Sequence, residues 1–382
     1  MRPDLVATFA SAAAHLVLGV AALSASPRDG ESARKDELRE LMALTDALAA
    51  GKPVGGGLVV AFEPHFLRGE DGLTYVPFSL AISEHSRQPN GFVVYVRVAV
   101  PGRAPAPPAS GKPGGIDLAT ADLAPGELPV GGSANRHPRT GRYGEASARL
   151  QLVDKDREAA RGPYVFEDSH VVEVNLGDET HPYRLQRALA VPPGEYVVYV
   201  AVAERGDPAG ASRSAVMRQP LEARDFSGET LSLSSLILAD RVVPSQVSSQ
   251  ARGRSRWRPY AIGSTEIVPA ASRELARDGE PAVAFQIYGA HLSPGRRPNV
   301  TLDYLVLIMK GDAYVPHARL PSQQLDQKTL PASFDPEAGH QLGAVQDIPV
   351  ACLAPGEYLL EVTATDAVAG ASARAAVDFA VR

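Results

Sequence analysis

One adjacent pair of carboxylates in this sequence consists of residue types that could support chemistry. Glu167 and Asp168 could supply a carboxylate for acid–base catalysis or for calcium binding. Adjacent side chains on a strand point to opposite faces, so we do not expect them to form a facing catalytic pair. No run of acidic residues at alternate positions surrounds them, so the sequence offers little support for a calcium site.

Histidine, serine and cysteine do not form a recognisable catalytic or metal-binding motif. No two histidines have helical zinc-site spacing, and neither a Gly-x-Ser-x-Gly elbow nor a Gly-rich phosphate loop is present. The single cysteine, Cys352, lies in an apolar stretch, so we expect a small buried hydrophobic residue. We expect surface positions for most histidines, although folding could pair some of them: His65, His85, His137, His170, His181, His291, His317 and His340. No cofactor is expected.

An aromatic residue among arginines is a candidate for an interaction surface. Trp257 lies between Arg256 and Arg258, and tryptophan with arginine is frequent at binding hot spots and in nucleic-acid patches. The formal net charge of −6 provides no overall basic field, which argues against a nucleic-acid partner. We therefore interpret this segment as a solvated linker, with Trp257 docking against the domain that follows.

An internal repeat is the most informative pattern in the chain. The segment from Leu189, LAVPPGEYVVYVAV, is echoed from Val350 by VACLAPGEYLLEVT, and Gly-Ala-Ser follows each copy. Two copies this far apart indicate duplicated domains rather than a solenoid. The Pro-Gly pairs predict type II turns, and a tyrosine at the head of the next strand predicts a tyrosine corner whose hydroxyl bonds back to the turn backbone. The residues are Pro193, Gly194 and Tyr196, and Pro355, Gly356 and Tyr358.

The elements that carry these residues are predicted to be strands, preceded by one amphipathic helix. Apolar residues at three- and four-residue spacing predict a helix over 32–50 that packs on the first domain, with partner binding as the alternative. Alternation and β-branched or aromatic runs predict the strands. Beside the strands of the repeat they cover 58–62, 75–82, 92–100, 148–153, 164–166, 170–176, 185–191, 230–238, 261–268, 282–288, 300–309 and 373–381.

The N-terminal residues have the order of a secretory signal. Arg2 precedes an uncharged apolar segment, Leu5–Leu23, and small residues follow up to Ser26. This order predicts export with cleavage, and a retained membrane anchor is the alternative. The predicted fold is therefore all-β, with two tandem immunoglobulin-like sandwiches. The predicted parts are a signal peptide or anchor (1–26), a helix and linker (27–57), a first sandwich (58–223) with a Pro/Gly-rich insertion (101–147), an inter-domain linker with a short strand (224–257) and a second sandwich (258–382).

The turn-and-strand unit starting at Leu353, LAPGEY, resembles the sandwiches of fibronectin type III and related extracellular modules. The segment from Leu231, LSLSSLILAD, followed by a Pro-Gly-Glu-Tyr domain, resembles the C-terminal region of exported von Willebrand factor A-related domain proteins of the Acidobacteria type. The resemblance covers about 58–382. Those proteins carry a metal-dependent Asp-x-Ser-x-Ser motif, but the nearest match here, from Asp225 to Glu229, lacks the second serine. No metal-binding role is carried over.

These observations together favour a non-enzymatic binding or structural module in the periplasm or on the cell surface. Sandwich loops and strand edges would face a protein or cell-envelope partner, and the membrane would be a partner only if the N-terminal segment is uncleaved. A carbohydrate-binding sandwich is one alternative, and it would need exposed aromatic residues although aromatics make up only 6% of the chain. A hydrolase with an inter-domain site is another, and it would need histidine, a carboxylate and serine to converge.

Overall fold

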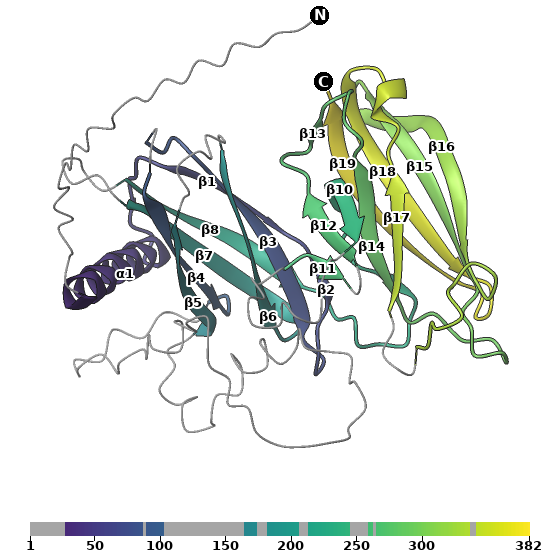
Figure 1. Cartoon of the computed structure of the whole chain (residues 1–382), viewed down its shortest axis with the longest axis horizontal. Coiled ribbons are helices and arrows are strands. Elements are labelled where there is room, and N and C mark those ends of the chain that lie inside the picture. Colours follow the sequence, from purple (N-terminus) through teal and green to yellow (C-terminus); the bar gives the residue numbers. More distant parts are fainter. Residues whose placement is uncertain are drawn as a thin grey trace, which may run out of the picture.

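One α-helix and two β-sandwiches form the main body of the part of the chain that the computed structural model describes (Figure 1). The described residues are 27–86, 89–102, 164–173, 182–205, 213–244, 259–262, 265–336 and 341–382. Helix α1 (Pro27–Ala49) precedes the first sandwich and overlaps most of the predicted helix, which it extends at the N-terminal end. The all-β prediction is confirmed.

The first sandwich has two antiparallel sheets. One sheet is built on β3, with β1 and β2 following each other along one edge and β6 along the other. The facing sheet has the order β5-β4-β7-β8. Each sheet has four strands, and two antiparallel sheets packed face to face are the architecture of an immunoglobulin-like sandwich. The strands are β1 (Val59–Pro64), β2 (Leu67–Arg68), β3 (Thr74–Ser83), β4 (Gly91–Ala99), β5 (Tyr164–Glu173), β6 (Tyr183–Val191), β7 (Gly194–Arg205) and β8 (Ser214–Ala223).

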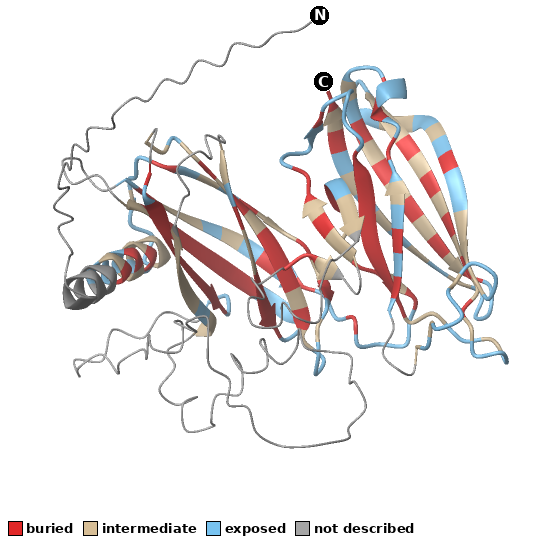
Figure 2. Ribbon diagram, in the orientation of Figure 1, coloured by how far each residue is buried: buried red, intermediate tan, exposed pale blue. Residues whose placement is uncertain are grey.

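Helix α1 explains why β4 is apolar at nearly every position. Every residue of β4 is buried, although a strand with one solvated face would alternate (Figure 2). Phe92 and its alternate neighbours enter the core between the sheets, while Val93 and Tyr95 point outward. Leu38 and Leu41 of α1 cover that outer face. The helix therefore packs on the first sandwich, which is the arrangement that its apolar stripe predicts.

The second sandwich repeats the plan with an added strand pair at its edge. One sheet has the order β11-β12-β10-β14-β17 with β9 beside β14, and the facing sheet has the order β13-β19-β18-β15-β16. All the strands pair antiparallel except β13, which is parallel to β19. They are β9 (Ser232–Leu233), β10 (Ile237–Pro244), β11 (Ala261–Ile262), β12 (Thr265–Pro269), β13 (Glu274–Leu275), β14 (Ala282–Tyr288), β15 (Val300–Lys310), β16 (Ala313–Leu325), β17 (Leu342–Asp347), β18 (Gly356–Asp366) and β19 (Ala371–Val381).

Several element predictions are corrected by the structure. β5 is one strand where two were expected, and the strand expected over 261–268 is divided into β11 and β12. β16 and β17 were not expected, because β16 contains Pro316 and Pro321 and neither strand has a long apolar run. Within the segment expected to be a linker, 224–257, β9 and β10 pair with β14, so the second sandwich starts ahead of residue 258.

Some predictions fall on other parts of the chain. The signal-type segment, nearly all of the 101–147 insertion and the strand expected over 148–153 lie outside the described residues.

Candidate functional site

Both tyrosines of the repeat bond back toward the turn that precedes them. The Tyr196 hydroxyl donates to the carbonyl oxygen of Pro192 at 2.9 Å, and the Tyr358 hydroxyl donates to that of Ala354 at 2.8 Å. Each bond reaches four residues upstream and ties the start of β7 or β18 to the connection before it. These are the hydrogen bonds of a tyrosine corner.

The type II turns expected at these corners are not formed. Such a turn needs a glycine φ near +80°, whereas Gly194 has φ +154° and Gly356 is not among the residues with positive φ. Each glycine instead begins a strand, directly after Pro193 or Pro355. A Cβ added at Gly194 would lie 3.4 Å from the Tyr196 hydroxyl, so the glycine leaves room for the tyrosine ring.

Cys352 is exposed, so the expectation of a buried residue is wrong. It lies at the end of a short 3₁₀ helix, Val350–Cys352. That turn directs Val350 into the core, and Leu353 after it is also buried, while Cys352 faces outward. The apolar stretch around the cysteine does supply buried residues, but its turn geometry excludes the thiol from them.

Glu167 and Asp168, both on β5, contact different partners. The Tyr95 hydroxyl donates to Glu167, whereas His170 Nε2 lies 2.8 Å from an Asp168 carboxylate oxygen. They do not form a facing pair, which is the arrangement that adjacent strand residues predict. The three residues of the expected interaction segment, Trp257, Arg256 and Arg258, lie outside the described residues.

His65 is buried between the two sandwiches, although a surface position was expected. Its side chain is 7% exposed, and it lies at the corner between β1 and β2. His65 Nδ1 is 2.9 Å from the Tyr260 hydroxyl of the second sandwich. Burial and the nearby charge of Arg273 lower the pKa of His65 to about 4, so the imidazole is neutral at neutral pH. No sequence motif marks this residue, because its partner is far along the chain.

Hydrogen bonds donated by main-chain N–H groups join the sandwiches beside His65. The Phe66 N–H donates to Ser235 Oγ at 2.8 Å, and the Ser235 N–H donates to the Phe66 carbonyl oxygen at 2.9 Å. Arg68 N–H donates to the Tyr288 hydroxyl at 2.9 Å. Because these bonds satisfy polar groups at a partly buried contact, they favour one arrangement of the two sandwiches over others.

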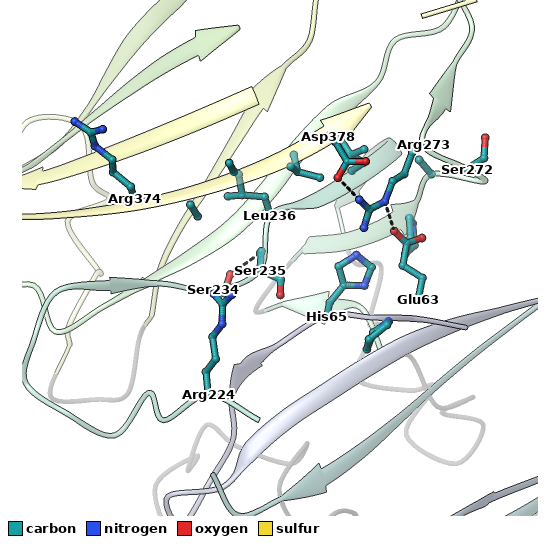
Figure 3. Close-up of a pocket in the computed structure, with 17 residues that line it drawn as sticks. Glu63, His65, Arg224, Ser234, Ser235, Leu236, Ser272, Arg273, Arg374 and Asp378 are labelled. Carbon is teal, nitrogen blue, oxygen red and sulfur yellow. Dashed lines mark hydrogen bonds and ion pairs between the residues drawn. The ribbon is translucent and has the colours of Figure 1, made fainter. Parts of the chain in front are cut away.

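A cavity of about 330 Å³ opens at this junction (Figure 3). On one side it is lined by the β1–β2 corner of the first sandwich and by Arg224, which directly follows β8. On the other side it is lined by residues 234–236 and β19 of the second sandwich. Arg273 bridges the sandwiches here, because its Nε lies 3.2 Å from Glu63 and its Nη1 contacts Asp378. In Figure 3, Arg224 and Arg374 lie toward the side of the cavity away from that bridge.

The cavity gathers the residue types of a hydrolase without their catalytic contacts. Ser235 Oγ accepts the Phe66 N–H, and Ser234 Oγ donates to the Ser235 carbonyl and accepts the Gln286 N–H. His65 pairs with Tyr260, and both carboxylates pair with Arg273. A pKa of about 4 also makes His65 a poor general base near neutral pH. The contacts of these side chains therefore hold the junction together.

Other classes of site leave few traces in the described ranges. No group of three or more His, Cys, Asp and Glu side chains in this part of the chain is placed to hold a metal ion. The large apolar side chains exposed there are aliphatic, so these residues provide no exposed aromatic platform for a sugar: Val59, Val100, Leu292, Val345 and Val368. Of the described helical residues, none belong to a helix with the length and apolarity needed to cross a membrane.

Comparison with known proteins adds little to this description. No protein-family model and no curated protein matches the chain. Two solved chains of Salmonella alpha-2-macroglobulin, a point mutant and a form reacted with methylamine, align with 86% of this chain at 10% identity and TM-score 0.20. Escherichia coli alpha-2-macroglobulin activated by porcine elastase aligns at 11% identity and TM-score 0.17. The chain spans only 17% to 24% of the length of these proteins, and TM-scores this low carry no argument about function.

Proposed function

We propose that this protein is an exported, non-catalytic binding module that presents its two sandwiches to a protein or cell-envelope partner. The junction is the observation that carries the proposal. Buried hydrogen bonds and the Glu63–Arg273–Asp378 bridge hold the sandwiches together, and residues of both line the cavity between them. A scaffold that forms a binding surface between rigid domains loses little conformational entropy when a partner docks.

Two further observations support this proposal. The order of residues 1–26 is that of a secretory signal, and the resemblance of the segment from Leu231 is to exported proteins. The serine and histidine side chains of the cavity are engaged in structural contacts, which favours binding over hydrolysis. Nucleic acid is not the proposed partner, because the chain has a formal net charge of −6.

Export is tested by expressing the full chain in a Gram-negative host, fractionating the cells and measuring the intact mass of the product. We expect a periplasmic protein that lacks about the first 26 residues. A full-length membrane-bound product would show that the N-terminal segment is an anchor, and the protein would still be located at the envelope. A full-length soluble cytoplasmic product would overturn the export part of the proposal.

Partner binding is tested by site-specific photocrosslinking in the same cells. A benzophenone amino acid replaces Arg224, which lines the cavity, and in a control protein it replaces the exposed Arg218 of β8, which does not. We expect a defined adduct with an envelope component from position 224 and none from position 218. Equal labelling at both positions, or none at either, would contradict a binding surface at the junction.

A further inference from the structure

β19 has one free edge, and that edge faces the cavity. Along its whole length, from Ala371 to Val381, it pairs with β18. On its other side only Ala380 and Val381 have a partner, the two residues of β13. Among the described strands, none pairs with residues 371–379 on that side. Residues 374–378 line the cavity between the sandwiches.

The strand register shows which main-chain groups this edge presents. The Ala380 N–H donates to the Arg273 carbonyl and the Arg382 N–H donates to the Leu275 carbonyl, so both point away from β18. In an antiparallel pair the direction of the N–H and C=O groups alternates from one residue to the next. The main-chain groups of Arg374 and Ala376 therefore point toward the free edge, while those of Ala375 point toward β18.

The side chains along this edge leave room for another strand. Ala376 is small and exposed, and Ala375 and Val377 turn into the core of the second sandwich. This stretch of β19 contains no proline. β8, the matching edge strand of the first sandwich, contains Pro220, and β16, at the other edge of the same sheet, contains Pro316 and Pro321. Proline is a common device for blocking strand addition, so these edges differ from that of β19.

The charges around the cavity favour an acidic end on an added strand. Arg374 lies near the start of the free edge, its side chain is 70% exposed, and its contact with Glu361 is a loose 3.6 Å. Arg224 lines the same cavity. The opposite end is closed by Arg273, which is already paired with Asp378 and Glu63. A strand antiparallel to β19 would place its carboxyl end beside Arg374 and Arg224.

From these observations we infer that the cavity receives an extended peptide segment of a protein partner, which adds to the free edge of β19 as an antiparallel strand. Main-chain bonds to Ala376 provide the affinity, and Arg374 and Arg224 bind an acidic residue or carboxylate at the C-terminal end of the segment. The inference rests on the proposed binding function and specifies its partner. Export is measured separately, so a failure of the peptide test leaves that measurement standing.

The experiment measures binding of a fluorescein-labelled hexapeptide, Thr-Val-Thr-Val-Asp-Glu, to the full chain by fluorescence anisotropy. The substitution Ala376→Pro removes the outward N–H and fills the edge with a ring, yet it spares the bonds to β18. We expect it to weaken peptide binding at least about tenfold. Arg374→Ala should weaken binding by a similar factor, whereas the matched control Arg319→Ala, on exposed β16, should leave it unchanged.

Two further readouts do not depend on the folding of any variant. Amide exchange measured by NMR should be fast at Ala376 in the free chain and slow once the peptide is added, while Ala375 is slow throughout. Two versions of the peptide are N-methylated at alternate residues, one at the odd positions and one at the even positions. The version whose methyl groups point toward β19 should lose binding, and the other version should keep it. No binding at millimolar peptide, unchanged exchange at Ala376, or equal binding of both methylated peptides would overturn the inference.

Discussion

At the scale of single residues, the two tyrosine corners show how one hydroxyl fixes the start of a strand. Tyr358 is fully buried and stacks on Phe379 of the neighbouring strand, with ring centroids 5.4 Å apart. Its hydroxyl reaches the Ala354 carbonyl at the edge of that apolar environment. The ring contributes buried area, and the hydrogen bond sets where β18 begins.

Replacing Tyr358 with phenylalanine removes that bond and keeps the ring. We expect Tyr358→Phe to lower the free energy of unfolding by about 1 kcal/mol, the usual net value of one hydrogen bond, as measured by urea denaturation. The matched control is Tyr314→Phe, on the half-buried start of β16, which should change the stability little. If the Tyr358→Phe protein is as stable as the wild type, the hydroxyl does not have the structural role assigned to it.

Arg97 is a second residue whose surroundings explain its position. It is 1% exposed, on the outward side of β4, and its guanidinium lies 4.4 Å from the ring centroid of Tyr164 and 5.1 Å from that of Tyr199. Its Nη1 is 2.6 Å from an Asp46 carboxylate oxygen of helix α1. The two rings and the carboxylate compensate part of the cost of burying the charge.

Removing the carboxylate charge tests this account. Asp46→Asn should lower the free energy of unfolding by about 1–2 kcal/mol, less than for a fully buried pair because the Asp46 side chain is 55% exposed. Glu40→Gln, at an exposed position of the same helix, is the control and should have little effect. Equal stabilities of the two variants in urea denaturation would show that Asp46 does not compensate Arg97.

At the scale of elements, helix α1 is part of the fold of the first sandwich. Leu41 is fully buried, and Thr45 one turn later is buried too, with its hydroxyl donating to the Leu41 carbonyl at 2.6 Å. Together with Leu38, Leu41 covers the outward face of β4 and β7. Without the helix, that sheet would expose an apolar face that soluble sandwiches keep covered.

Truncating Leu41 measures how strongly the helix packs. We expect Leu41→Ala to lower the free energy of unfolding by about 2–4 kcal/mol, because it removes buried methyl groups and leaves a cavity. Glu40→Ala, at the adjacent exposed position, should lie within about 0.5 kcal/mol of the wild type. A small loss for Leu41→Ala, or a separate early transition of α1 alone, would show that the helix is only loosely attached.

At the scale of the whole molecule, the junction depends on a neutral histidine. His65 is a base whose pKa falls from 6.5 in the unfolded chain to about 4 in the folded protein. Between these two values the unfolded chain binds a proton more readily than the folded one does, so acid favours unfolding. Above about pH 7 both forms are neutral, and His65 contributes no pH dependence.

The resulting prediction concerns stability between pH 7 and pH 4. Over that range His65 should reduce the free energy of unfolding by about 3 kcal/mol, at about 1.4 kcal/mol for each pKa unit. His65→Gln keeps a polar side chain that cannot titrate. Between pH 7 and pH 4 the free energy of unfolding of this variant should therefore fall by about 3 kcal/mol less than that of the wild type. Urea denaturation at several pH values checks this, and parallel curves for the two proteins would refute it.

The local patterns of the chain were sufficient to predict its secondary structure class and much of its core. Alternation predicted the strands β18 and β19, and the apolar stripe of α1 predicted that the helix packs on the first sandwich. These predictions succeeded because each depends on residues close together in sequence. β16 was missed for the same reason, since its prolines disturb the local pattern while long-range pairing with β15 still forms the strand.

The sequence by itself therefore determined the all-β class, the repeat and the tyrosines at the two corners, because periodicity and turn residues act over a few positions. Only the tertiary structure decided that His65 is buried against Tyr260, that Arg273 bridges two carboxylates, and that the free edge of β19 faces a cavity. His65 and Tyr260 are 195 positions apart. No local pattern records such a contact, because the packing of two complete domains creates it.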